Sequence, residues 1–200
     1  LTMNGIKNLL DIGIEPVIKS TLTKDNADDA EEMENIIHGL GLPFKKGWLL
    51  NKRTDGKISK IEDLRLPAER ILLLEEDIYI NRLVEKKSNN NSDTREGIFY
   101  CSAGKSSFVM NSSGELNLCS DFPLPAASVP QKGFPAAWKE LVDFIDITTK
   151  QKSTCSTCEA NGYCNTCPAW SYLETQKMDE PVPYLCDIAF KRKDKYEQRA

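Results

Sequence analysis

Four cysteines within 13 residues constrain this chain more than any other feature of its sequence. They form two CxxC motifs, Cys155-Ser-Thr-Cys158 and Cys164-Asn-Thr-Cys167. A CxxC loop turns two sulfurs toward one point, and such loops bind zinc ions or iron–sulfur clusters. The two motifs therefore predict a metal site in the segment 155–167.

Three more cysteines accompany this cluster. The seven all fall in the second half of the chain, at Cys101, Cys119, Cys155, Cys158, Cys164, Cys167 and Cys186. An odd number would leave one thiol over in a disulfide framework. Secreted disulfide scaffolds are usually short, whereas about 100 cysteine-free residues precede Cys101. We therefore expect a cytoplasmic protein whose thiols are metal ligands.

Composition excludes several other classes of function. The net charge of −4 provides no basic patch for nucleic acid, and no apolar run approaches the ~20 residues of a membrane span. His38 is the only histidine, so one chain cannot build a His-based acid–base pair, and we expect a structural role for it.

Arg53 and Asp55 follow a predicted strand at the edge where parallel sheets present functional residues. A solvated loop is the simpler interpretation of this pair.

The first half of the chain alternates helix and strand patterns. We expect a short helix around Ile6, a buried strand over 16–23, a helix over 29–40 that Asp28 or Asp29 caps, and a strand over 43–50. This order is typical of a parallel α/β sheet. Two strands do not make a stable sheet alone, so we expect further strands upstream of the first residue.

The second half has an α+β pattern. A helix is expected to begin near Pro67 and to reach Val84, and the polar segment 87–93 is the expected domain boundary. Beyond this boundary the expected elements are a β-hairpin over 108–118 with its turn at Gly114, a helix over 135–147, and short helices from Pro168 and Pro183.

The spacing of all seven cysteines resembles a known pattern. Twelve residues separate Cys101 from Gly114, four more lead to Cys119, and the four-cysteine run and Cys186 follow after gaps. This order resembles the SPASM motif of radical S-adenosylmethionine (SAM) enzymes over about residues 99–190. The last gap of the four-cysteine run has two residues, where the family more often has three.

The front half resembles the end of the same family's barrel. The resemblance rests on Gly13-Ile14, the strand 17–23, Asn26, Leu42-Pro-Phe44 and Asn51-Lys-Arg-Thr-Asp-Gly56. It implies a C-terminal remnant of a partial (β/α)6 barrel over 1–60, a helical linker over 61–98, and a cysteine-rich SPASM domain over 99–192.

The resemblance also assigns the ligands of two auxiliary [4Fe–4S] clusters. The first cluster is expected to be held by Cys101, Cys119 and Cys167. The second cluster is expected to be held by Cys155, Cys158, Cys164 and Cys186. Seven thiols are one short of eight, so the first cluster has an open iron or a ligand that is not cysteine. Candidates for that ligand are Asp121, Ser106 and Ser107, although solvated loop positions are the simpler interpretation of all three.

The family's reaction needs a part that this sequence lacks. A third [4Fe–4S] cluster in a CxxxCxxC loop cleaves SAM in the intact enzymes, and no such spacing occurs here. The chain is therefore expected to be inactive alone. In the intact enzyme, the resemblance implies a peptide or protein substrate and an electron donor such as flavodoxin or ferredoxin. The stretch Cys167-Pro-Ala-Trp-Ser-Tyr-Leu-Glu174 resembles maturases of ribosomal peptides.

Three alternatives stay open. One is a fragment of a sulfatase-type maturase. Another is a non-catalytic iron–sulfur module for electron transfer or peptide binding. The third is a zinc module in which the two CxxC motifs form one tetrahedral site, but this would leave Cys101, Cys119 and Cys186 without a role.

Overall fold

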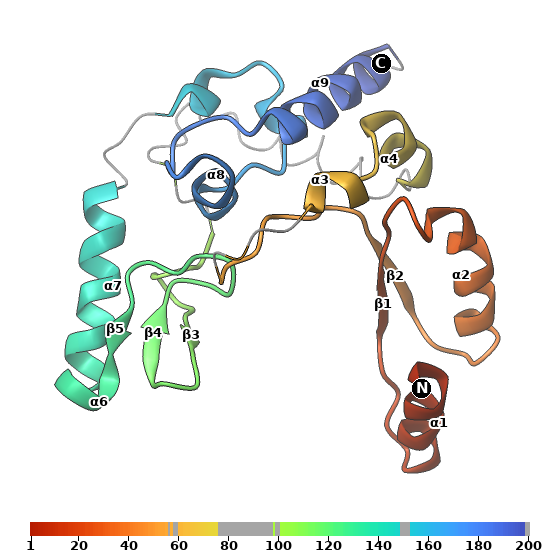
Figure 1. Cartoon of the computed structure of the whole chain (residues 1–200), viewed down its shortest axis with the longest axis horizontal. Helices are drawn as coiled ribbons and strands as arrows, with labels where there is room; N and C mark the ends of the chain where they lie inside the picture. The colour runs from red at the N-terminus through yellow and green to blue at the C-terminus, as the bar shows by residue number, and fades with distance from the viewer. Residues whose placement is uncertain (56, 58–59, 76–97, 99–100, 149–152, 199–200) are drawn as a thin grey trace. The chain divides into compact units, whose positions relative to one another are not determined.

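The chain folds into two compact units of mixed helix and strand (Figure 1). The first comprises Leu1–Leu50 and Lys60–Pro67, and the second comprises Asn51–Ser59 and Ala68–Ala200. The expected division at 60/61 and 98/99 stays a prediction, because its proposed boundary loop lies outside the described residues. This computed structural model describes residues 1–55, 57, 60–75, 98, 101–148 and 153–198.

The first unit is built around two parallel strands, as the alternating pattern predicts. Strand β1 pairs with β2 in the register Ile18↔Phe44. The side chains of Ile6, Ile37 and Leu42 form a buried core to which Ile18 and Phe44 add. Helices α1 and α2 therefore pack against the sheet through their apolar positions. The elements are α1 (Thr2–Asp11), β1 (Ile18–Thr21), the 3-10 helix η1 (Ala27–Asp29), α2 (Ala30–His38), β2 (Phe44–Gly47) and α3 (Ile61–Leu64).

Three details of the first unit differ from the expectation. Strand β1 is shorter than predicted and half-buried, since its side chains alternate between partly buried and exposed positions. Asp29 occupies the N-cap position of α2, but its side chain makes no capping hydrogen bond. Ile36 remains 47% exposed although it fits the helical spacing. His38 is the last residue of α2 and is exposed.

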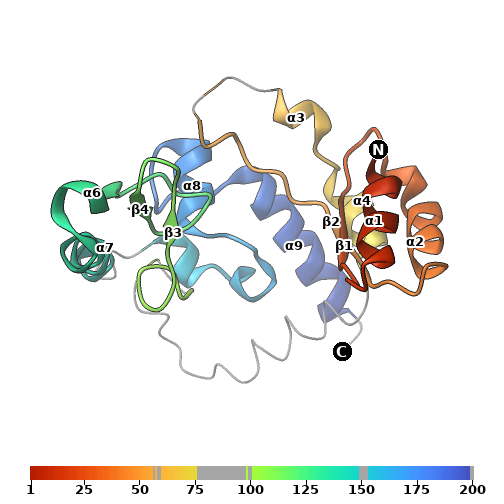
Figure 2. The same ribbon diagram turned by 90° about the horizontal axis from the view of Figure 1, so that it is seen from below.

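The second unit combines a small antiparallel sheet with helices. The predicted hairpin is confirmed: β3 pairs with β4, and β4 pairs with β5. Figures 1 and 2 both show α7 beside this sheet. The elements are α4 (Ala68–Leu74), β3 (Val109–Met110), β4 (Glu115–Asn117), β5 (Ala127–Ser128), α6 (Val129–Lys132), α7 (Phe134–Thr148), the 3-10 helices η2 (Thr154–Thr157) and η3 (Asn161–Tyr163), α8 (Pro168–Thr175) and α9 (Pro183–Glu197).

One buried core joins the sheet of the second unit to two of its helices. Leu116 and Leu118 from the hairpin pack with Leu141 and Ile145 of α7. Cys119 and Cys167 lie at the edge of the same core. The core therefore fixes the positions from which these two thiols project.

The helices of the second unit largely match the expectation. Helix α7 covers the predicted span, and α8 and α9 begin at the two predicted prolines. Proline suits the first helical position, where no intrahelical partner exists for an N–H. Helix α9 has 15 residues, so it is longer than the short helix expected. Helix α4 ends at Leu74, and residues 76–84 of the expected helix lie outside the described residues.

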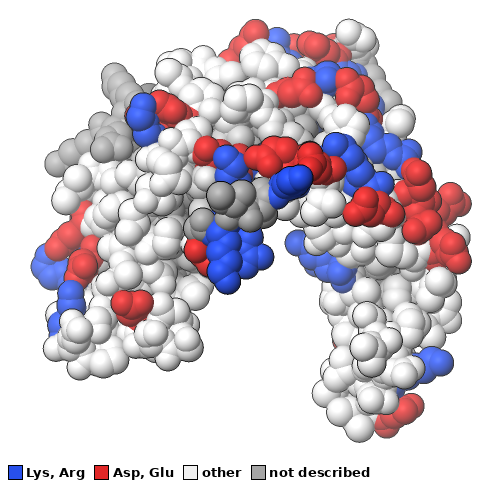
Figure 3. Space-filling model, viewed as in Figure 1, with Lys and Arg blue, Asp and Glu red and all other residues white. Residues whose placement is uncertain are grey.

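The surface carries charges of both signs. In Figure 3, Lys and Arg side chains are interspersed with Asp and Glu over the face shown. Among the helices of the described residues, none has the length and apolar character needed to cross a membrane.

Candidate metal centres

A glycine turn fixes the hairpin that leads to Cys119. Gly114 has φ +75, a conformation that favours glycine. The Asn111 side-chain oxygen accepts the N–H groups of Ser113 at 2.9 Å and Glu115 at 3.0 Å. A Cβ at Gly114 would lie 2.9 Å from Cγ of Pro130. The glycine of the cysteine pattern therefore has a structural reason, which is a tight turn packed on α6.

A second glycine turn follows Cys101. Gly104 has φ +69, and its N–H donates to the carbonyl of Ser107 at 2.9 Å. A Cβ at this position would lie 2.6 Å from side-chain atoms of both Leu118 and Ile145. The turn is thus seated directly on the core beside Leu118, the residue that precedes Cys119.

The hairpin thiols, which we define as Cys101, Cys119 and Cys167, influence one another electrostatically. Burial raises the pKa of Cys119, and the charge of Cys101 raises it further. Burial also raises the pKa of Cys167, and the charges of Cys119 and Cys101 add to this rise. Two of the hairpin thiols, Cys119 and Cys167, also pack against the same buried core.

Backbone groups near two of these thiols lower their pKa values. For Cys119 these are the backbone N–H groups of Asp121 and Phe122. Cys167 is the N-cap residue of α8. The N–H groups of Trp170 and Ala169 at the start of that helix lower its pKa in the same way. N–H donors stabilise thiolate, which is the form that ligates metals.

The loop thiols, which we define as Cys155, Cys158, Cys164 and Cys186, form the other group. Burial raises the pKa of Cys164 to about 11, the N–H of Thr166 lowers it, and the charges of Cys186 and Cys155 raise it. Burial raises the pKa of Cys186 as well, and the charges of Cys155 and Cys158 add to this rise. These four thiols therefore share one electrostatic environment.

Short turns position the loop thiols. The Ser153 hydroxyl accepts the N–H of Cys155 at 3.1 Å and caps η2. The side-chain amide of Asn161 donates to the carbonyl of Cys155. The Cys164 thiol lies 3.9 Å from the carbonyl oxygen of Leu185, which precedes Cys186 in α9. Cys164 and Cys186 are thus brought together from different elements.

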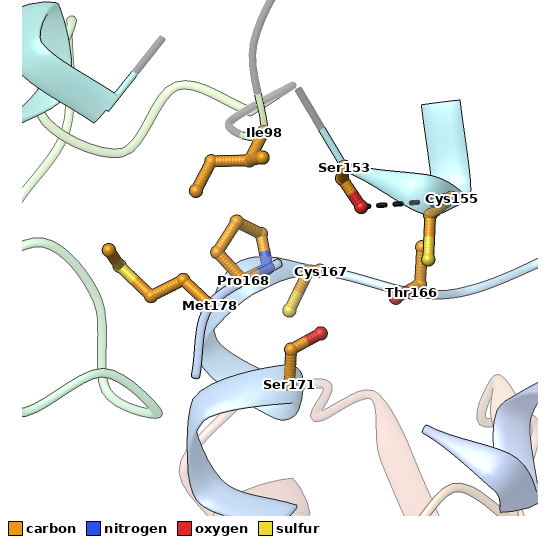
Figure 4. A pocket seen from close by; sticks show the side chains of 8 residues that line it. All are labelled: Ile98, Ser153, Cys155, Thr166, Cys167, Pro168, Ser171 and Met178. Carbon is orange, nitrogen blue, oxygen red and sulfur yellow. Dashed lines mark hydrogen bonds between the residues drawn. The ribbon is translucent and has the colours of Figure 1, made fainter. Parts of the chain in front are cut away.

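A small cavity lies where the two groups of thiols meet (Figure 4). Its volume is about 10 Å³, which is roughly the space that one water needs. Cys167 of the hairpin thiols and Cys155 of the loop thiols both line it. The remaining lining residues are Ile98, Ser153, Thr166, Pro168, Ser171 and Met178.

The other candidate residues fall into different settings. Asp121 lies two residues after Cys119, and its charge raises the pKa of that thiol. The hydroxyl of Ser107 pairs with that of Ser102 at 2.9 Å on the exposed side of its turn, and Ser106 is exposed. Arg53 donates to Asp55 at 2.8 Å in an exposed pair that lowers the pKa of Asp55 to about 2. The solvated-loop interpretation fits this last pair.

One set of residues was missed by the sequence analysis. Arg192 of α9 and Glu75, which follows α4, form an ion pair with side chains only 1% and 0% exposed. Arg192 also contacts Tyr163 and Asn165, the residues on either side of Cys164. The available signal was the spacing of Leu185, Ile188 and Arg192, which places an arginine on the apolar face of a helix.

No disulfide joins the seven cysteines. Within the described parts of the chain, no three side chains of His, Cys, Asp or Glu lie close enough to hold a single metal ion. Comparisons with protein-family models, with curated proteins and with solved structures gave no match. The chemistry of the site therefore rests on its donor set, which is seven thiols in two groups, three of which have backbone N–H groups that lower the pKa of the thiol.

Proposed function

We propose that this chain is the C-terminal part of a radical SAM enzyme that binds two auxiliary [4Fe–4S] clusters and modifies a peptide or protein in the cytoplasm. The observation that carries the proposal is the environment of Cys167. This thiol is three residues from Cys164 in sequence, yet it packs against the same buried core as Cys119, and the charges of Cys119 and Cys101 raise its pKa. The interleaved grouping matches the ligand partition that the SPASM resemblance implies.

The same observation favours two clusters over one zinc site. A tetrahedral zinc ion would draw all four CxxC thiols around one point. Here the thiol charges that raise the pKa of Cys164 are those of Cys186 and Cys155, whereas the charge of Arg192 lowers it. A four-iron cluster places each thiolate on a different iron, so its sulfurs stand further apart than the ligands of one ion. This arrangement suits thiols that share an environment without meeting at one point.

The chain's own residues provide three things for such clusters. The hairpin thiols and loop thiols supply seven ligands, and Asp121 is our candidate for the eighth. Backbone N–H groups at Cys119, Cys164 and Cys167 stabilise the thiolate form. The core behind Cys119 and Cys167 excludes water from one side, and burial and hydrogen bonds to sulfur tune cluster potentials. When bound, the clusters supply one-electron chemistry, for which we propose flavodoxin or ferredoxin as the electron donor.

The first test is metal content with single cysteine changes. Anaerobically reconstituted protein should hold about eight iron and eight sulfide per chain, as expected for two four-iron clusters. Cys167→Ala should leave about four iron, with the spectrum of the second cluster intact. Cys164→Ala should also leave about four iron, but here the remaining spectrum should be that of the first cluster. Elemental analysis with EPR spectroscopy of the reduced variants measures both.

Two results would contradict the proposal. Stoichiometric zinc without sulfide in the wild-type protein would establish the zinc module. Loss of the same EPR signal in both variants would show that Cys164 and Cys167 belong to one local four-cysteine site.

A second prediction concerns SAM. We expect no reductive cleavage of SAM by this chain alone, because none of its cysteines has the CxxxCxxC spacing. The measurement is 5′-deoxyadenosine released under reducing conditions, compared with a variant in which all seven cysteines are alanine. Release above that background would show that one of the two clusters itself binds and reduces SAM.

A further inference from the structure

The strongest feature outside the thiols is the ion pair of Arg192 and Glu75, which is nearly inaccessible to solvent. Arg192 Nε donates to both carboxylate oxygens of Glu75, at 2.9 and 3.1 Å, and its Nη2 contacts the same carboxylate. A buried ion pair of this kind is weak evidence for stability, since removing both charges from water offsets much of their attraction. Its position therefore calls for a separate reason.

The remaining donors of Arg192 point at the segment that carries Cys164. Its Nη1 donates to the carbonyl of Tyr163 at 2.9 Å and to the side-chain oxygen of Asn165 at 2.5 Å. One guanidinium thus binds the residues on both sides of a single loop thiol. Arginine suits this task because its planar fork presents several donors in fixed directions.

Helix α9 contacts the Cys164 segment at two positions along its length. The carbonyl of Leu185 faces the Cys164 thiol near the start of the helix. About two turns later, Arg192 binds the residues on both sides of Cys164. The same helix carries Cys186. The segment with Cys164 contains only a short 3-10 helix, so it has little structure of its own to keep its thiol in register with Cys186.

We infer that Arg192 is a positioning residue for the second cluster, with Glu75 orienting its guanidinium, so that Cys164 is presented to the same cluster as Cys186. The inference rests on the proposed function and deepens it. Residues that orient metal ligands through hydrogen bonds typically change metal affinity by about 10–100-fold when they are replaced. We assign that role to the three-way contact of Glu75, Arg192 and the Cys164 segment.

The test uses variants that keep the buried charge balanced. Arg192→Lys retains a cation for Glu75 but lacks the fork needed to bind Tyr163 and Asn165 together. Asn165→Ala removes one contact on the Cys164 side and leaves the ion pair in place. The control is Lys193→Gln. It removes an ion pair at 3.0 Å between α9 and Glu159 of the same cysteine-rich loop, and the Glu159 side chain is 68% exposed. Exposed ion pairs of this type contribute little to the free energy of unfolding.

All three changes are made in the full chain and in its Cys167→Ala variant, which we expect to hold the second cluster alone. The measurements are the rate of iron release to a ferrous chelator, the EPR spectrum of the reduced cluster, and thermal unfolding of the metal-free chain. Arg192→Lys should release iron from the second cluster about 10-fold faster or more, with an altered EPR spectrum. Asn165→Ala should act in the same direction without changing unfolding of the metal-free chain, and Lys193→Gln should match the wild type.

The outcomes distinguish a failure of the proposed function from a failure of the role assigned to Arg192. If the wild-type protein binds no iron and sulfide, the proposed function itself fails. If it binds both clusters, and Arg192→Lys and Asn165→Ala release iron at the wild-type rate with unchanged spectra, the inference is overturned. In that case a lower unfolding temperature of Arg192→Lys would identify the ion pair as purely structural.

Discussion

Replacing Gly104 by alanine should destabilise the second unit by about 3 kcal/mol. Two effects add at this position. The φ of +69 lies in the left-handed region, where a side chain costs about 1–2 kcal/mol. The new methyl group would also lie 2.6 Å from both Leu118 and Ile145, and such overpacking costs about 1–3 kcal/mol. Urea denaturation of the metal-free chain measures the free energy of unfolding.

A matched control separates strain from packing. Gly41 has φ +75 just after α2, and no atom beyond its chain neighbours lies within 4 Å of an added Cβ. Gly41→Ala should therefore show the backbone strain alone, about 1 kcal/mol. Equal losses for the two variants would mean that the turn after Cys101 is not seated on the core as the structure places it.

Replacing Phe122 by alanine should cost about 3–5 kcal/mol and should also weaken the first cluster. The ring is only 1% exposed. It meets the ring of Tyr172 edge-to-face at 5.5 Å and the ring of Phe144 at 6.0 Å. Tyr172 belongs to α8, the helix that begins after Cys167, while Phe122 pairs with Cys119 in a short bridge. The ring therefore connects the elements that carry two hairpin thiols.

The control for Phe122 is an aromatic residue at the surface. Phe134 is 41% exposed and contacts the rings of Phe108 and Trp138, so Phe134→Ala should cost about 1 kcal/mol. Denaturation reports the stability of each variant, and iron analysis reports its clusters. In Phe122→Ala we expect the EPR signal of the first cluster to fall while that of the second persists. Equal loss of both signals would show that the effect is general unfolding rather than a change at the hairpin thiols.

The local elements of this protein could be predicted because their signals are contained in short stretches of sequence. The hairpin around Gly114 joins two apolar runs through a polar turn, and each helix after a proline begins where that ring is tolerated. The parallel pairing of β1 and β2 follows from the helix between them, since a parallel connection needs a crossover. The half-burial of β1 could not be predicted, because burial depends on what packs on each face.

The sequence by itself determined the supply of thiols, the glycine turn at Gly114 and the order of elements, since spacing and backbone preference act over a few residues. Tertiary structure decided which thiols share an environment. Cys167 is separated from Cys164 by only two residues, but α8 and the core draw it toward Cys119. Tertiary structure also decided the partner of Arg192, because Glu75 lies 117 positions away. Contacts over such distances depend on how helices pack, and the spacing along the chain does not specify that packing.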